Sequence, residues 1–278
     1  MRLGIPLFED CSSPELWISA LKRAGYSAAF CPVGGDQSDD VIKAYVEAAK
    51  SANIEIAEVG AWSNPMSSDN ETRRLAILNC QKQLALADKI GARCCVNISG
   101  SRGQQWDGPH PDNLTEKTFD LIVETVRVII DAVKPTRSFY TLETMPWMYP
   151  DSADSYLRLI KAIDRKSFAA HFDPVNLICS PQRYYSNAEL IKECFAKFGQ
   201  YIKSCHAKDT IMSGRLTTHI DETRPGLGNL DYHTYLQEIN KLDPDTTIMV
   251  EHLPNAEEYK LASEHIRSVA KETGITIK

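Results

Sequence analysis

The chain has 278 residues, 43% of them hydrophobic, and a formal net charge of −6. This length suits one large α/β domain or two smaller domains. The acidic balance argues against a nucleic-acid partner, which usually requires a basic face. No apolar stretch is long enough for a signal core or a membrane span, so we expect no membrane partner.

The chain contains eight cysteines and no CxxC pair. Several of them, including the adjacent Cys94 and Cys95, lie inside apolar runs typical of strands. In such runs cysteine acts as a small hydrophobic residue. We therefore expect reduced thiols and a cytoplasmic protein.

Apolar strand segments alternate with amphipathic helical segments along the whole chain. The predicted strands are 3–8, 28–31, 54–59, 94–98, 138–143, 168–173, 201–206 and 247–251. The predicted helices are 13–25, 38–52, 70–90, 115–133, 152–163, 187–198, 231–241 and 257–272. A loop of about twenty residues, 210–229, precedes the seventh helix and could close over a site.

Strands without polar alternation indicate a parallel sheet that is covered by helices. Eight such units in this length predict a single (β/α)8 TIM barrel that spans residues 1–278 as one domain. In this fold, catalytic residues lie at the carboxyl ends of the strands.

Four successive predicted strands end in an ionisable residue: Glu143, Asp173, His206 and Glu251. If the barrel forms, these residues converge on one side of its mouth. The alternative is that each is an ordinary surface, turn or strand residue, as when Asp173 before Pro174 only initiates a turn.

Three carboxylates placed together repel one another, and a divalent cation removes that conflict. Three oxygen ligands and one imidazole suit Mn, Mg, Co or Zn, with Mn and Mg favoured by the hard oxygens. Such an ion leaves room for a vicinal hydroxyl and carbonyl of a substrate. Proton loss beside that carbonyl would give an enediolate, and a carboxylate can act as the base.

Five segments carry a family resemblance: 141–143 (TLE), 171–176 (HFDPVN), 206–209 (HAKD), 225–231 (PGLGNLD) and 250–251 (VE). With them the whole chain resembles the xylose isomerase-like barrel superfamily, and within it the sugar (phosphate) isomerase/epimerase group of the tagatose/psicose 3-epimerases. The resemblance implies one divalent metal, often Mn, with Glu143, Asp173, His206 and Glu251 as ligands. It also implies that Glu143 and Glu251 are the acid and base that epimerise or isomerise a ketose or a related keto-carbohydrate.

One position departs from the family pattern. The sugar epimerases usually carry a histidine three residues after the strand-six aspartate, where this chain has Asn176. Asparagine can orient a hydroxyl but cannot carry a proton at neutral pH. This difference leaves a modified specificity or a dehydratase chemistry open.

Candidate substrate-binding residues lie in the loops at the predicted active end. Tryptophan faces pack well on the CH faces of sugars, although loop anchoring explains them nearly as well. Lys208 could bind a substrate oxygen or pair with Asp209, and Arg224 could neutralise an anion. His171 could line the pocket or be a buried structural residue. The candidates are Trp62, Trp106, Trp147, His171, Asn176, Lys208, Arg224 and His252.

No glycine-rich phosphate cradle follows the last strand, which favours a non-phosphorylated small-molecule carbohydrate as substrate. The main alternative is a dehydratase of the inosose or dehydroshikimate type, with His171 or His252 as the acid. A non-catalytic carbohydrate-binding or partner subunit is a second alternative. The endonuclease IV branch is disfavoured by scattered histidines and acidic charge. Barrels of this group commonly pair through outer helices, so the chain could form a homo-oligomer.

Overall fold

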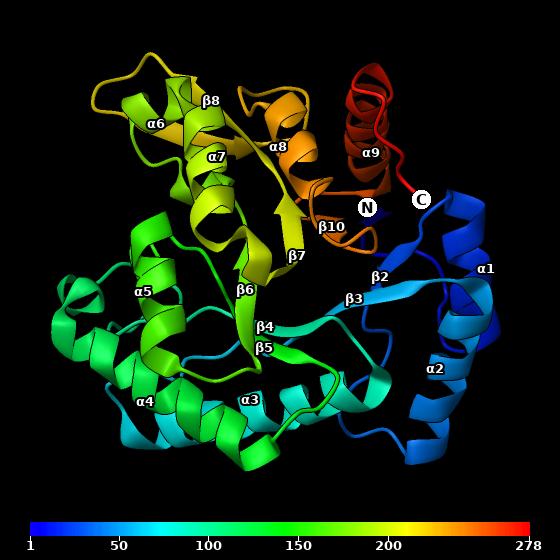
Figure 1. Cartoon of the computed structure of the whole chain (residues 1–278), viewed down its shortest axis with the longest axis horizontal. Coiled ribbons are helices and arrows are strands. Elements are labelled where there is room, and N and C mark those ends of the chain that lie inside the picture. Colours follow the sequence, from blue (N-terminus) through cyan, green and yellow to red (C-terminus); the bar gives the residue numbers. More distant parts are fainter.

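A computed structural model describes residues 1–278, and its main feature is an eight-stranded parallel sheet that curves into a nearly closed barrel (Figure 1). The strand order is β1-β10-β7-β6-β5-β4-β3-β2, and neighbouring strands pair in parallel. The barrel strands are β1 (Arg2–Gly4), β2 (Ala28–Phe30), β3 (Glu55–Gly60), β4 (Cys94–Asn97), β5 (Phe139–Glu143), β6 (Phe168–Phe172), β7 (Ile202–Ala207) and β10 (Thr247–Val250).

Helices connect consecutive barrel strands and cover the outside of the sheet, which confirms the predicted (β/α)8 barrel. The α-helices are α1 (Pro14–Ala24), α2 (Asp39–Ala52), α3 (Asn70–Ile90), α4 (Glu116–Val133), α5 (Ala153–Ile163), α6 (Pro181–Tyr185), α7 (Asn187–Phe198), α8 (Tyr232–Ile239) and α9 (Ala256–Glu272). Three short 3-10 helices are η1 (Pro111–Leu114), η2 (Val175–Leu177) and η3 (Gly199–Tyr201). None of the helices is long and apolar enough to cross a membrane.

Local sequence explains where the helices begin and end. The side chain of Ser13 accepts a hydrogen bond from the Leu16 amide at the start of α1, and Asp69 caps α3 through the Thr72 amide in the same way. These caps satisfy backbone donors that lack a partner within the helix. Gly91 ends α3 with φ of 78°, a left-handed conformation that favours glycine.

The strands are buried, as the sequence predicted, although some buried positions, such as Glu58 and His171, are polar. Cys94, Cys95 and Cys205 are fully buried in β4 and β7, and all eight cysteines are free thiols. Their burial agrees with the interpretation of these cysteines as small hydrophobic residues.

The prediction that residues 210–229 form a loop is partly wrong. It contains an antiparallel hairpin of β8 (Asp209–Ser213) and β9 (His219–Thr223), in which Ile211 pairs with Asp221. Of the three glycines in this segment, at 214, 226 and 228, only Gly214 lies between the two strands. The hairpin lies beside α6 at the C-terminal end of the barrel (Figure 1).

Candidate metal centre and active site

Four ionisable side chains converge at the C-terminal ends of neighbouring strands. Glu143 ends β5, Asp173 follows β6, His206 lies in β7, and Glu251 follows β10. One ligand atom from each side chain lies within 4.8 Å of the others. Because β5, β6, β7 and β10 are consecutive in the sheet, their ends bring the four residues to one side of the barrel mouth, as predicted.

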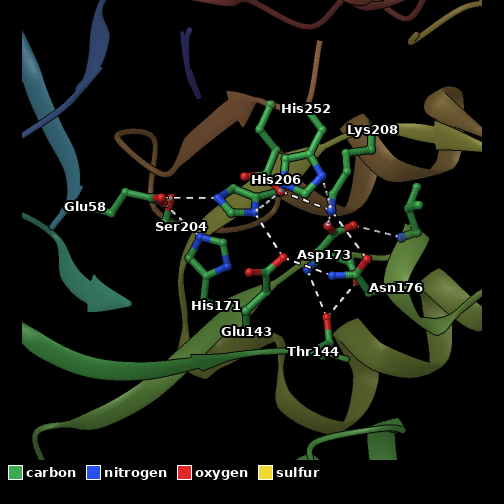
Figure 2. Close-up of polar contacts among 12 residues, drawn as sticks. Glu58, Glu143, Thr144, His171, Asp173, Asn176, Ser204, His206, Lys208 and His252 are labelled. Carbon is green, nitrogen blue, oxygen red and sulfur yellow. Dashed lines mark hydrogen bonds and ion pairs between the residues drawn. The ribbon is translucent and has the colours of Figure 1, made fainter. Parts of the chain in front are cut away.

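Hydrogen bonds with Thr144 fix the backbone of Asp173, and the Val175 amide fixes its carboxylate. Thr144 Oγ1 donates to the Asp173 carbonyl at 2.6 Å and accepts from the Asp173 amide at 3.1 Å (Figure 2). Oδ1 accepts from the Val175 amide at 2.9 Å, which closes the turn into η2. The remaining oxygen, Oδ2, is buried and accepts no hydrogen bond of good geometry. One oxygen therefore fixes the side chain, and the other faces the cluster, where the Lys208 ammonium lies 2.8 Å away.

The imidazole of His206 is contacted by carboxylates through both ring nitrogens. Nδ1 lies 2.9 Å from Oε1 of Glu251 and 3.2 Å from Oε1 of Glu143. On the other side of the ring, Nε2 lies 3.1 Å from Oε1 of Glu58 (Figure 2). A proton on Nε2 that is donated to Glu58 leaves Nδ1 as the nitrogen that faces the cluster and can ligate a metal.

Glu58 reaches the site from the opposite wall of the barrel, because β3 and β7 are separated by several strands on either side. Its Oε2 lies 2.8 Å from His171 Nε2 and accepts from Ser204 Oγ at 3.1 Å. Burial alone would raise the pKa of Glu58, but the charges and hydrogen bonds of His206 and His171 outweigh it and lower the pKa to about 2. The group is therefore an ionised acceptor beneath the cluster.

Glu58 was missed in the sequence analysis. Strand 54–59 (IEIAEV) contains two glutamates, and Glu58, between Ala57 and Val59, was the available signal, because a charged residue within a buried strand needs a partner.

Lys208 is the principal cation of the cluster and is 2% exposed. Its Nζ lies 2.8 Å from Oδ2 of Asp173, 3.0 Å from Oε1 of Glu251 and 3.1 Å from Oε1 of Glu222. It also donates to Oδ1 of Asn176 at 3.3 Å. Lys208 therefore binds carboxylates across the mouth.

The alternative in which Lys208 pairs with Asp209 is wrong. Asp209 instead accepts four backbone N–H groups, from Thr210, Gly226, Gly228 and Leu230, at 2.8–3.1 Å. A Cβ at Gly228 would lie 2.3 Å from Asp209 Oδ1. Asp209 thus fastens the loop that follows the hairpin, which gives a structural reason for glycine in the PGLGNLD segment.

Burial and the neighbouring charges shift the pKa values of the three clustered carboxylates in different directions. Burial alone would raise the pKa of Glu143 and of Glu251, but the adjacent His206 outweighs it and lowers both, that of Glu251 well below the usual range. Burial raises the pKa of Asp173 to about 6; Lys208 opposes this rise and Glu143 adds to it. One carboxylate is thus held close to protonation by its surroundings.

The residues present fit a divalent metal ion. Carboxylates outnumber basic groups here, because the four carboxylates of Glu143, Asp173, Glu251 and Glu222 face only Lys208, His206 and His252. Asp173 Oδ2 is a buried oxygen that accepts no regular hydrogen bond and lies 2.8 Å from the Lys208 ammonium, so it already faces a positive charge. Oxygen-rich sites with one imidazole suit Mn or Mg, and also Co or Zn.

A hollow of about 570 Å³ opens over the cluster. Glu143 and Glu251 line it, together with Trp62, Trp106 and Trp147, whose side chains remain 38–45% exposed. The three tryptophans therefore lie where the sequence predicted them, beside both glutamates.

The other candidate substrate-binding residues separate into two groups. Asn176, Lys208 and His252 also line the hollow, and Asn176 donates to Oε1 of Glu143 at 3.0 Å. His171 is fully buried beneath it against Glu58, so the buried alternative holds for this residue. Arg224 lines an adjoining hollow of about 190 Å³, which shares Lys208, Glu222, Glu251 and His252 with the larger one. Its guanidinium pairs with Glu258 at 2.9 Å.

Glu222 was also missed, because it lies in β9, inside the segment predicted as a loop. Besides its contact with Lys208, its Oε2 lies 2.9 Å from Nδ1 of His252. Burial alone would raise its pKa, but the His252 hydrogen bond and the Lys208 charge outweigh it and lower the pKa to about 2. The hairpin therefore contributes an ionised carboxylate to the wall of the hollow.

Comparisons with known proteins agree with this architecture. The family model for the xylose isomerase-like TIM barrel matches residues 18–269. No curated protein matches the sequence of the chain. Among solved structures, a D-tagatose 3-epimerase-like protein is 20% identical, covers 99% of this chain and 98% of its own, and has a TM-score of 0.71.

Two further solved structures are similar in fold. The probable 3-DHS dehydratase from Bacillus anthracis is 14% identical, with a TM-score of 0.69 and coverage of 96% of this chain and 98% of its own. A xylose isomerase-like TIM barrel protein from Mycobacterium smegmatis, in complex with magnesium, is 16% identical, with a TM-score of 0.67 and coverage of 94% and 89%. At these identities the likeness concerns the fold.

Proposed function

Because the chain belongs to the xylose isomerase-like TIM barrel family, we propose that it is a metal-dependent epimerase or isomerase of a ketose or a related keto-carbohydrate. The observation that carries the proposal is the position of Glu143 and Glu251, which flank Nδ1 of His206 and both line one hollow. Two carboxylates beside one substrate site are what proton removal and return require.

Glu143, Asp173, His206 and Glu251 would hold one divalent ion, with Mn favoured and Mg, Co or Zn as alternatives. When bound, the ion would supply Lewis-acid activation of a neighbouring carbonyl. Similarity to a family that includes a magnesium complex supports this assignment.

In both Glu143 and Glu251, one carboxylate oxygen makes all the polar contacts. All hydrogen bonds and ion pairs of Glu143 and of Glu251 fall on Oε1, the oxygen next to His206. Oε1 of each residue would thus serve the ion, and Oε2 would face the substrate carbon. In the proposed reaction, Oε2 of one glutamate takes the proton beside the carbonyl, and Oε2 of the other returns a proton to the opposite face or to the neighbouring carbon.

The surrounding residues would hold the sugar in place. Asn176 connects Glu143 to Lys208, which restrains the carboxylate that transfers the proton. Trp62, Trp106 and Trp147 would pack on CH faces of the sugar ring and exclude water.

A metal-dependent dehydratase is the second candidate, because His252 lies at the edge of the same hollow. Its Nε2 is 3.6 Å from Oε1 of Glu251, and its pKa is raised, mainly by the hydrogen bond to Glu222. A protonated His252 could give its proton to a departing hydroxyl while a glutamate removes the proton on the adjacent carbon. The C–O bond then breaks and water leaves.

NMR of a keto-sugar panel in deuterated water, with Mn or Mg and the purified protein, tests the proposal. We expect deuterium at one carbon beside the carbonyl, together with an epimer or an aldose. An unsaturated product would instead establish the dehydratase. Bound metal without exchange on any free, phosphorylated or glycosylated keto-sugar would contradict both and favour a non-catalytic binding subunit.

A further inference from the structure

The hollow over the cluster continues into a second one. The outer hollow has a volume of about 330 Å³ and shares Pro146, Trp147, Asn176 and Glu222 with the inner hollow of about 570 Å³. Its far wall comes from β9 and from Cys179, just before α6. Pockets for drug-sized ligands span about 300–1,000 Å³, so the inner hollow alone exceeds the low end of that range. The two together are larger than a single hexose needs.

The charges along both hollows oppose an anionic substrate. Lys208 is the only lysine or arginine in the two walls, and its ammonium is already contacted by Asp173, Glu251 and Glu222. The outer hollow has no cationic side chain, and Asp221 and Glu222 line it with carboxylates. A phosphate there would meet like charge. Sugar hydroxyls, in contrast, can donate hydrogen bonds to carboxylates.

Trp147 stands at the junction of the two hollows. Its Nε1 donates to the Asp107 carbonyl at 2.7 Å, which fixes the orientation of the indole ring. The side chain remains 39% exposed and lines both hollows. An indole held in this way offers a flat apolar surface between two sugar-sized spaces.

From this geometry we propose that the substrate is a neutral glycosylated keto-sugar, whose second glycosyl unit occupies the outer hollow between Trp147 and the β8–β9 hairpin. This inference rests on the proposed function. The reacting keto-sugar would lie over Glu143 and Glu251, and hydroxyls of the second unit would donate to Asp221 and Glu222. Trp147 is then a residue that determines specificity rather than one that moves a proton.

Calorimetric titration of the Mg-loaded protein tests the inference. The probes are D-fructose, D-fructose 6-phosphate and the four glucosyl-fructoses linked through O3, O4, O5 or O6. We expect at least one glucosyl-fructose to bind about tenfold or more tightly than fructose, a difference that corresponds to about 1.4 kcal/mol. We expect the phosphate ester to bind most weakly. Equal binding of fructose and all four disaccharides, tighter binding of the phosphate ester, or no binding of any disaccharide would overturn the inference.

A variant pair locates the effect in the outer hollow. Cys179→Trp should fill that space, so it should weaken the preferred disaccharide about tenfold more than it weakens fructose, whereas Cys179→Ala should preserve the preference. An unchanged preference in Cys179→Trp would also overturn the inference. Deuterium exchange is measured separately. Exchange on free ketoses without a preference for a disaccharide would overturn this inference and leave the proposed function intact. A preference for a disaccharide without exchange on any ligand would overturn the proposed function and leave the binding of a second glycosyl unit intact.

Discussion

The two ends of the barrel both carry charged residues but place them differently. At the mouth, Lys208 is 2% exposed and lies among the carboxylates of Asp173, Glu251 and Glu222. At the bottom, Asp245 is 37% exposed and pairs with Arg2 and Lys278. At the bottom each carboxylate is matched by basic groups, whereas the mouth gathers several carboxylates around Lys208.

We interpret the charges at the bottom as contributors to stability and those at the mouth as parts of a functional site. Arg2 joins strand β1 to the loop before β10 through Asp245, and it also donates to the Asn53 side chain at 2.8 Å. Such contacts secure the closure of the barrel. The mouth cluster gathers like charges at a cost that an ordinary core would avoid, which is typical of binding and catalytic sites.

The largest expected effect is at the mouth. Glu251→Gln removes the proposed proton-transfer group while it preserves the shape of the side chain, so solvent exchange of a keto-sugar substrate should fall by about 10²–10⁴-fold, the range for loss of a general base. Circular dichroism should show an intact fold, because the substitution also relieves repulsion with Glu143. Exchange within tenfold of wild type would exclude the proton-transfer role. Glu257→Gln, on the exposed first turn of α9, is the matched control.

A ligand substitution should affect the metal more than the fold. Asp173→Asn keeps the Oδ1 acceptor for Val175 but removes the negative charge that faces the cation. Loss of a residue that only hydrogen-bonds to a metal ligand weakens metal affinity about 10–100-fold, so loss of a ligand charge should weaken Mn or Mg affinity by at least ~100-fold. Metal analysis and calorimetry measure the change. Full metal loading of the variant at wild-type affinity would remove Asp173 from the ligand set.

A smaller effect is expected beneath the mouth. Glu58→Gln replaces an acceptor with a group that must donate through one of its atoms, so the Nε2 proton of His206 loses its carboxylate partner. We expect metal affinity to fall about 10–100-fold, as is typical for partners of ligating histidines. The control is Glu55→Gln, at the other end of β3, which faces Arg93 at 3.7 Å.

Nitrogen-15 NMR of the Zn-loaded wild type provides a second measurement for Glu58. It should show His206 protonated at Nε2 and metal-bound at Nδ1. The opposite tautomer, or equal metal affinity in the Glu58→Gln and Glu55→Gln variants, would reduce Glu58 to a purely structural group.

The smallest effect is expected at the bottom. Hydrogen bonds from Lys278 and Arg2 lower the pKa of Asp245 to about 2. Because the folded-state pKa lies below the unfolded value of about 3.9, the stabilisation is complete above pH 4 and is lost as the pH falls toward 2. Asp245→Asn should therefore destabilise the protein at pH 7 by less than about 1 kcal/mol, and urea unfolding should show the difference shrinking below pH 4. A difference that grows below pH 4 would contradict this assignment.

Local patterns made the fold and the mouth predictable. The strand-ending residues Glu143, Asp173, His206 and Glu251 could be placed together because the alternation of strands and helices specified a barrel, and a barrel specifies where strand ends meet. The helix ends followed from capping residues such as Ser13 and Gly91.

Contacts between distant segments were not predictable in the same way. Glu58 acts across the barrel, and Glu222 depends on a hairpin whose strands have no helix between them. The role of Asp209 depends on backbone N–H groups, which carry no side-chain signature. Such groups become visible only when strand order and loop geometry are known.

A crystal structure of the protein soaked with Mn, with anomalous diffraction at the Mn edge, tests the central claim most directly. The account predicts one anomalous peak within ligand distance of Glu143, Asp173, His206 and Glu251, next to Nδ1 of His206. A peak elsewhere, or none at the mouth at saturating Mn, would contradict the account.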